Sequence, residues 1–195
     1  FFESMKPYIA IISLGLLWAC NSGDKKVGEK VGAEPVKSEH SDAFNSSFER
    51  ILNSYYLLKD GLFASDTVKV NRSTLALISA ADSLNLNELK KSDSNNIIIP
   101  TALSYTGTIS SEGKGLLGEN DIEAKRKEFQ MISGALFDLI RTVRYDGQKI
   151  YLLNCPMAFN NQGADWLSST PDIQNPYFGA KMPTCGNLKD SIVLK

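Results

Sequence analysis

Histidine is nearly absent from this chain, and its sulfur-containing residues are few. The 195 residues include one histidine, three cysteines and four methionines. Because the single histidine, His40, lies in a polar stretch near the N-terminus, a Ser/His/Asp or Cys/His catalytic set cannot be assembled in a folded domain. The cysteines also lack the C-x-x-C spacing that is typical of dithiol oxidoreductases. We therefore expect a protein that is not an enzyme, and a His40 that is solvated and idle.

An excess of charge and long apolar runs are also lacking. The 21 basic and 22 acidic residues leave a formal net charge of -1. The sequence has neither the basic stripe nor the interleaved aromatic residues that would indicate a nucleic-acid-binding surface. After residue 20, no apolar run approaches the about 20 residues that a membrane-spanning helix needs. We expect no nucleic-acid partner and attachment to a membrane only through the N-terminus.

The N-terminus has the features of a bacterial lipoprotein signal. A basic start at Met5 is followed by an apolar stretch from Tyr8 to Trp18, and the letters LWAC at 17–20 match the order expected around an acylated cysteine. We predict a signal peptide at 1–20 with Cys20 as lipid anchor; the alternative is a plain secretory signal with an incidental cysteine. The expected location is the cell envelope, facing the periplasm, on the outer rather than the inner membrane.

A polar segment separates this signal from the first apolar pattern. Residues 21–43 are rich in Gly, Ser, Lys and Glu and have no apolar periodicity, so they cannot bury enough surface to fold. We predict a flexible tether at 21–43.

Residues 44–146 predict an up-and-down bundle of three to four helices, which makes the fold mainly α. Two helices have apolar residues at steps of three and four along one face. The first face comprises Phe44, Phe48, Ile51, Tyr55, Leu58 and Leu62. The last comprises Ile122, Phe129, Ile132, Leu136, Ile140 and Val143, with the charged residues Glu123, Lys125, Arg126, Lys127 and Glu128 expected on its solvated side.

The two middle helices have weaker patterns. Asp60-Gly61 is expected to end the first helix, and Ser65 or Asp66 to cap the second. Its inward residues are predicted to be Val68, Leu75, Ile78 and Ala81. A short third helix is predicted at 101–111, followed by a loop in which Gly113, Gly115 and Gly118 match G-x-G-x-x-G by spacing alone, without the strand that a dinucleotide site requires.

The C-terminal segment, 147–195, predicts a small loop-rich module with short strands at 149–153 and 191–194. A segment of this size packs poorly alone, so we expect it to lie against the bundle. Three aromatic residues in it have alternative interpretations: they form its small core, or they are a lid or partner-binding patch. These residues are Trp166, Tyr177 and Phe178.

Four of the seven sulfur-containing residues form two clusters in this module. Cys155 and Met157 are two positions apart, and Met182 and Cys185 are three apart. Thiolates and thioethers favour Cu(I) over hard cations, so the four residues are candidate Cu(I) ligands. The alternative is a structural Cys155–Cys185 disulfide, because cysteines of the cell envelope usually pair. The residues alone leave both open.

The same module resembles a known family. The run CPMAFNNQGADWLSS from Cys155, the NPYFG from Asn175 and the later Met182 and Cys185-Gly186 are similar to DUF3347 of Bacteroidetes, over about residues 44–190. That family occurs in lipoproteins and fused to periplasmic adaptor subunits of heavy-metal efflux pumps. The resemblance implies that the protein buffers copper or a related metal, or passes it to an efflux-pump adaptor or other envelope protein. The alternative is a disulfide-stabilised interaction module without metal.

Overall fold

The computed structural model describes residues 38–192. The predicted signal peptide with Cys20 and most of the predicted tether lie outside the described residues, as do residues 193–195. None of the helices within the described range combines the length and the apolarity that crossing a membrane requires.

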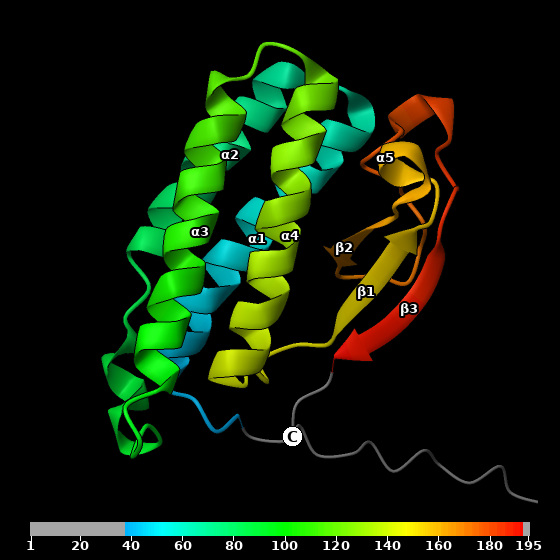
Figure 1. Ribbon diagram of the computed structural model, residues 1–195. Helices are drawn as coiled ribbons and strands as arrows, with labels where there is room; N and C mark the ends of the chain where they lie inside the picture. Colours follow the sequence, from blue (N-terminus) through cyan, green and yellow to red (C-terminus); the bar gives the residue numbers. More distant parts are fainter. Residues whose placement is uncertain (1–37, 193–195) are drawn as a thin grey trace, which may run out of the picture. The chain divides into compact units, whose positions relative to one another are not determined.

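Four long helices form the first part of the fold (Figure 1). They are α1 (Asp42–Ala64), α2 (Thr67–Asp82), α3 (Ile98–Gly118) and α4 (Ile122–Val143), with a short 3-10 helix, η1 (Leu86–Lys91), between α2 and α3. Each long helix packs against the next one along the chain, as in an up-and-down bundle. The prediction of a mainly α bundle is confirmed.

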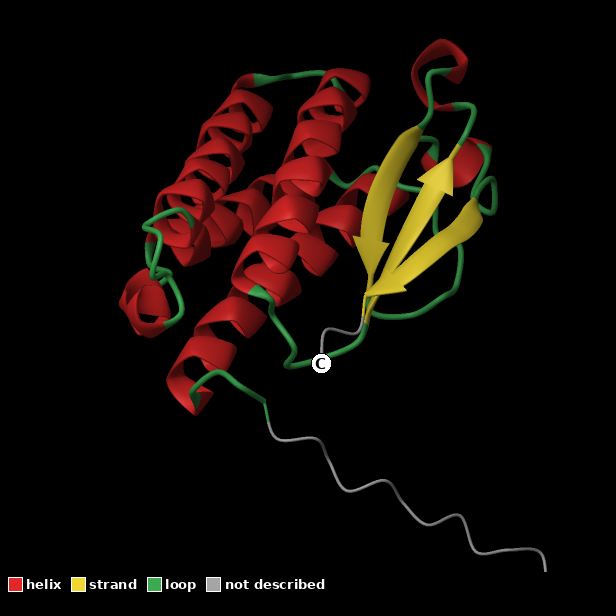
Figure 2. Cartoon of the chain, turned by 60° about the horizontal axis from the view of Figure 1, so that its bottom comes forward, coloured by secondary structure: helices red, strands yellow, loops and turns green. Residues whose placement is uncertain are grey.

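Three strands form the second part, as an antiparallel sheet (Figure 2). The strands are β1 (Ile150–Cys155), β2 (Ala164–Ser168) and β3 (Asn187–Ile192), in the order β2-β1-β3. Two short helical turns, α5 (Ala158–Asn161) and η2 (Gly179–Lys181), lie in the connections. The sequence pattern does not predict β2, since this five-residue strand is defined by its pairing with β1 rather than by an apolar alternation of its own.

The helices begin where side chains cap them. Ser41 accepts a hydrogen bond from the backbone N–H of Phe44, Asp66 from that of Lys69, and Asp121 from that of Ala124. These side chains satisfy backbone donors that have no partner inside the helix. The predicted cap at Asp66 is confirmed.

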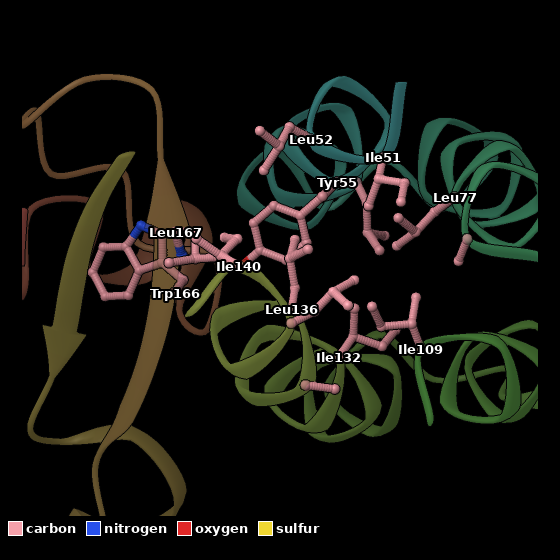
Figure 3. Packing of buried hydrophobic residues seen from close by; sticks show 14 of the residues in the cluster. Ile51, Leu52, Tyr55, Leu77, Ile109, Ile132, Leu136, Ile140, Trp166 and Leu167 are labelled. Atoms are coloured by element: carbon pink, nitrogen blue, oxygen red, sulfur yellow. Dashed lines mark hydrogen bonds between the residues drawn. The ribbon is translucent and has the colours of Figure 1, made fainter. Parts of the chain in front are cut away.

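The apolar faces of α1 and α4 make the centre of the bundle. All six residues predicted for the α1 face are buried, and all of the α4 face except the half-buried Ile122. Tyr55 of α1 stacks on Phe129 of α4, with ring centroids 5.2 Å apart. Figure 3 shows Ile51, Leu136 and their neighbours meeting between the helices.

The predicted inward face of α2 is wrong at two of its four residues, since Ala81 is buried and Ile78 is half-buried. Val68 and Leu75 are 68% and 59% exposed, whereas Val70 and Leu77 are buried. The buried face also contains Thr74, whose hydroxyl donates to the carbonyl of Val70 at 2.8 Å. A hydroxyl satisfied within its own helix can be buried at little cost, so apolar periodicity alone does not reveal this face.

Lys125 is buried, although its place in the pattern of α4 predicts a solvated side chain. Its Nζ donates to the carbonyl of Leu116 at 2.7 Å and to Oδ1 of Asn71 at 3.0 Å. Desolvation lowers the pKa of this amine. The lysine thus gives a second donor to a carbonyl in the last turn of α3, which also accepts from the backbone N–H of Glu119 at 3.3 Å.

Two glycines lie inside helices where the sequence predicts breaks. Gly61 does not end α1. A Cβ at this position would lie 3.0 Å from Cγ2 of Val70, so the glycine allows α2 to approach α1 closely. Helix α3 continues past residue 111 to Gly118, and a Cβ at Gly113 would lie 2.8 Å from Cγ1 of Ile78. The G-x-G-x-x-G spacing therefore lies within a packed helix and not in a phosphate-binding loop.

The sheet packs against the bundle, as predicted for the module. The backbone N–H of Leu167 donates to the hydroxyl of Tyr55 at 3.0 Å, and that hydroxyl is 2.7 Å from Oγ of Ser133. In Figure 3, Leu167 points towards the helices, whereas the indole of Trp166 points away from them. Successive strand residues face opposite sides of a sheet, so β2 contributes to a core on each of its faces.

Candidate functional site

The fold brings Cys155 and Cys185 together. Cys155 is the last residue of β1, and Cys185 lies two residues before β3. Because β3 runs antiparallel to β1, with Asn154 opposite Asn187, the end of one strand meets the start of the other. The two sulfur atoms are 3.7 Å apart, and both cysteines are free thiols.

The two thiols differ in their exposure to solvent. Cys155 is completely buried, whereas Cys185 is partly exposed. Desolvation, together with the hydrogen bond to Cys155 and the proximity of its charge, raises the pKa of the Cys185 thiol. A metal ion that binds here must therefore displace protons.

The two candidate methionines lie on the segments that carry the cysteines. Met157 directly precedes α5 and is 45% exposed. Met182 is half-buried, and its carbonyl accepts a hydrogen bond from the backbone N–H of Cys185 at 3.3 Å. Among residues 38–192, no hydrogen bond joins either methionine sulfur to a cysteine. The structure thus brings the two thiols into contact, whereas the two thioethers are near them in the sequence.

Asn175 holds the loop that carries Cys185. It is fully buried, and its Nδ2 donates to the carbonyl of Cys185 at 2.7 Å. Its Oδ1 accepts from the backbone N–H of Tyr177 at 2.8 Å, and its own N–H donates to the carbonyl of Pro183 at 3.0 Å. The sequence pattern does not single out this residue for the site, although an asparagine before proline is a known turn signal.

Gly186 fills a space that no larger residue fits. A Cβ at this position would lie 2.8 Å from the carbonyl oxygen of Asn154 and 2.9 Å from the Trp166 ring. Its φ of 152° is also one that glycine adopts more readily than other residues. Only glycine therefore allows the backbone directly after Cys185 to lie this close to Asn154 and Trp166.

The aromatic residues of the module divide between its core and its surface. Trp166 is completely buried and Tyr177 is 3% exposed, whereas Phe178 is half-buried. The Tyr177 ring lies 6.1 Å from that of Trp166 and 5.8 Å from that of Phe129 in α4, measured between centroids. Tyr177 thus connects the module to the bundle.

The turn after Cys155-Pro156-Met157 has an uncommon backbone. Phe159, Asn160 and Asn161 have φ angles of 51°, 59° and 66°. Left-handed conformations cost about 1 to 2 kcal/mol for each such residue, although asparagine tolerates them better than most. The packing of Phe159 against Tyr177, with centroids 5.4 Å apart, helps to hold this turn.

Arg126 attaches the module to the bundle, contrary to its predicted place on the solvated side of α4. It is 1% exposed. Its guanidinium donates to the carbonyls of Pro176 and Leu62 at 2.8 and 3.0 Å and to Oγ of Ser65 at 3.1 Å. It also pairs with Glu123 at 2.8 Å. No spacing in the sequence indicates this, because the carbonyl and hydroxyl partners come from two distant segments, the end of α1 and the loop of Pro176.

His40 is not solvated, so that expectation is wrong. Its side chain is 8% exposed, its Nδ1 lies 3.3 Å from Oε1 of Glu88, and its ring stacks on Phe44. A groove of about 1050 Å³ beside it is lined by residues of the N-terminal segment, η1 and the end of α4. Both ring nitrogens of His40 have other partners, Glu88 and the carbonyl of Arg144, so His40 is not a candidate ligand beside the thiols.

Within the part of the chain that the structure describes, no cluster of three or more His, Cys, Asp or Glu residues could hold a metal ion. A metal at the thiol pair would thus need thioether or external ligands in addition to the two thiolates. Two sulfur ligands, with two more close by in sequence, are the chemically distinctive feature of the fold.

Comparison with known protein families identifies a match for the helical part. The model of the family described as "Protein of unknown function (DUF3347)" matches residues 51–147. The matched range covers the helices from the middle of α1 to the end of α4 and stops before β1, so it does not include the thiol pair. No curated protein and no solved structure matches the chain.

Proposed function

The chain belongs, through residues 51–147, to the DUF3347 family of unknown function, and from its thiol pair we infer that it binds a soft metal ion of the Cu(I) type. The observation that carries this proposal is the 3.7 Å separation of the Cys155 and Cys185 sulfurs, where the end of β1 meets the start of β3. The helical bundle serves as the scaffold on which the two strand ends are held.

The sulfur separation suits a bridging metal ion. Bonds from thiolate to a d10 ion such as zinc are about 2.3 Å long, and two such bonds at a tetrahedral angle place their sulfurs about 3.8 Å apart. The observed 3.7 Å is close to that value. A metal ion could therefore bind with little movement of either strand.

The ligand type favours Cu(I) over other metals. Thiolates and thioethers select soft ions, and Met157 and Met182 lie close to the two cysteines in the sequence. Zinc prefers cysteine with histidine, and His40 is engaged elsewhere. We propose Cys155 and Cys185 as the principal ligands and the two methionines as additional ones.

The cellular setting of the proposal comes from the N-terminal sequence. The predicted lipid anchor at Cys20 and polar tether would hold the domain in the cell envelope, facing the periplasm. There the protein would buffer Cu(I) or pass it to an efflux-pump adaptor or another envelope protein.

The second candidate is a disulfide-stabilised interaction module without metal. The observation that favours it is the same contact between the two free thiols, which lie 30 residues apart in sequence. A disulfide that closes a loop of this length stabilises a fold by about 3 to 4 kcal/mol in the chain-entropy estimate. Such a disulfide would occupy both principal metal ligands.

Copper titration of the reduced protein distinguishes the two candidates. Under anaerobic conditions and against a competing colorimetric chelator, the parent should bind about one Cu(I) ion, and a Cys155→Ala, Cys185→Ala variant none. Replacing Met157 and Met182 by leucine should lower the affinity and leave the metal-free melting temperature nearly unchanged, because the volume is preserved.

Met131→Leu provides a matched control. Met131 lies on α4, is 54% exposed, and should have no effect on copper affinity. Equal affinity in the parent and in the Met157→Leu, Met182→Leu variant would remove both methionines from the site. If the parent did not bind copper, the interaction module would replace the metal proposal.

A further inference from the structure

The thiol pair has one protected and one accessible member. Cys155 is completely buried at the end of the central strand, whereas Cys185 is partly exposed in the loop before β3. Of the two residues, only Cys185 is therefore open to reagents in solution. The Cys155 sulfur lies only 3.7 Å from it.

The surroundings allow the two sulfurs to bond without loss of the fold. A disulfide bond is about 2.05 Å long, so the sulfurs must approach each other by about 1.7 Å from their present separation of 3.7 Å. The backbone on both sides is already fixed, by the pairing of Asn154 with Asn187 and by the hydrogen bond from Asn175 to the carbonyl of Cys185. Side-chain rotation at the two cysteines is the main change required.

We propose that Cys185 is the site at which low-molecular-weight disulfides react with this protein, and that Cys155 resolves the product. The Cys185 sulfur, giving up its proton, attacks one sulfur of the disulfide R–S–S–R, forming a Cys185–S–S–R bond and releasing one thiol, R–SH. The Cys155 sulfur then attacks the Cys185 sulfur and releases the second R–SH. The protein dithiol is oxidised by two electrons, and the external disulfide is reduced to two thiols.

This inference uses the sulfur pair of the proposed function and deepens it. The closed disulfide leaves no thiolate at either cysteine, so it cannot hold Cu(I) in the manner proposed above. The state of the surrounding thiols and disulfides would then decide whether the protein can take up metal. The exchange reaction itself does not require that the protein bind any metal.

The test uses the full chain with Cys20→Ser, so that Cys155 and Cys185 are its only cysteines. The reduced protein is incubated without oxygen with oxidised glutathione and analysed by intact mass and by peptide mapping. We expect both thiols to be lost without retained glutathione, and an internal Cys155–Cys185 disulfide that dithiothreitol reopens under native conditions. Retained glutathione on Cys185 or no reaction would overturn the proposal.

Single variants separate the two roles. With Cys155→Ala added, glutathione should remain attached to Cys185, because nothing resolves the mixed disulfide. With Cys185→Ala instead, attachment to Cys155 should be at least about tenfold slower, since the buried thiol reacts only after local opening. Equal rates in the two variants would contradict the assigned roles.

The outcomes for metal and for exchange are distinguishable. Copper binding by a protein that does not exchange would overturn the exchange proposal alone. Exchange by a protein that binds no copper would overturn the metal proposal alone.

Discussion

Replacement of Arg126 by methionine tests how the C-terminal module is held. Methionine keeps the apolar packing of the arginine stem but removes the donors to the carbonyls of Pro176 and Leu62 and to Ser65. The carbonyl of Leu62 keeps its hydrogen bond from the backbone N–H of Ser65 at 3.2 Å. The change therefore affects Pro176 and the NPYFG loop most.

The expected destabilisation follows from these contacts. A buried acceptor that loses its charged donor costs about 1 to 3 kcal/mol. The half-exposed pair with Glu123 adds at most about 1 kcal/mol. We expect the free energy of unfolding to fall by about 1 to 4 kcal/mol, and the melting temperature by about 2 to 15 °C for a domain of this size.

Urea unfolding of Arg126→Met, followed by circular dichroism, measures this loss. Lys127→Met is the matched control, because Lys127 is the exposed neighbour on the same helix and should change the free energy by less than about 0.5 kcal/mol. Labelling of Cys185 should also become faster in Arg126→Met if the loop loosens. A loss no larger than in Lys127→Met would refute our account of how the module is attached.

Three further predictions concern other parts of the chain. Leu136 is completely buried, so Leu136→Ala should lower the free energy of unfolding by about 2 to 5 kcal/mol in a urea titration; a negligible change would mean that this face of α4 is not core. If Cys20 is acylated, Cys20→Ala should move the protein from the detergent-extracted to the soluble envelope fraction, and unchanged fractionation would contradict a lipid anchor. Partial burial would raise the pKa of Glu88 and of Asp146, but hydrogen bonds from Ser41 to Glu88 and from Ser38 to Asp146 outweigh it, and both pKa values are lowered. Their stabilising contribution is therefore present above the unfolded pKa of about 4 and lost as the pH falls below it. The protection of the amides at 38–41 against hydrogen exchange should decrease in that range before the helices unfold, and constant protection down to about pH 3 would show that these carboxylates do not hold the segment.

Several features of the fold can be predicted from local sequence. The apolar faces of α1 and α4 are long and regular, because each helix turns one side to a single core. The capping residue Asp66 is evident for a similar reason, since it acts within its own helix turn. The spacing of Cys155 with Met157 and of Met182 with Cys185 is likewise a local signal, and it is enough to mark the module as chemically unusual.

Other features depend on contacts between distant segments. The inward face of α2 contains a polar residue, Thr74, which can be buried because its hydroxyl donates a hydrogen bond to the carbonyl of Val70. Arg126 is buried because acceptors from the end of α1 and from the NPYFG loop meet at its position. Helix α3 has a glycine at position 113 because Ile78 of α2 leaves no room there for a larger side chain.

The thiol pair shows the same division. The sequence by itself determined that two cysteines occur near two methionines in a small module. Only the tertiary structure decided that the sulfurs lie 3.7 Å apart, with one buried and one accessible. The physical reason is that β3 pairs antiparallel with β1, and the register of that pairing depends on hydrogen bonds between segments far apart in the chain.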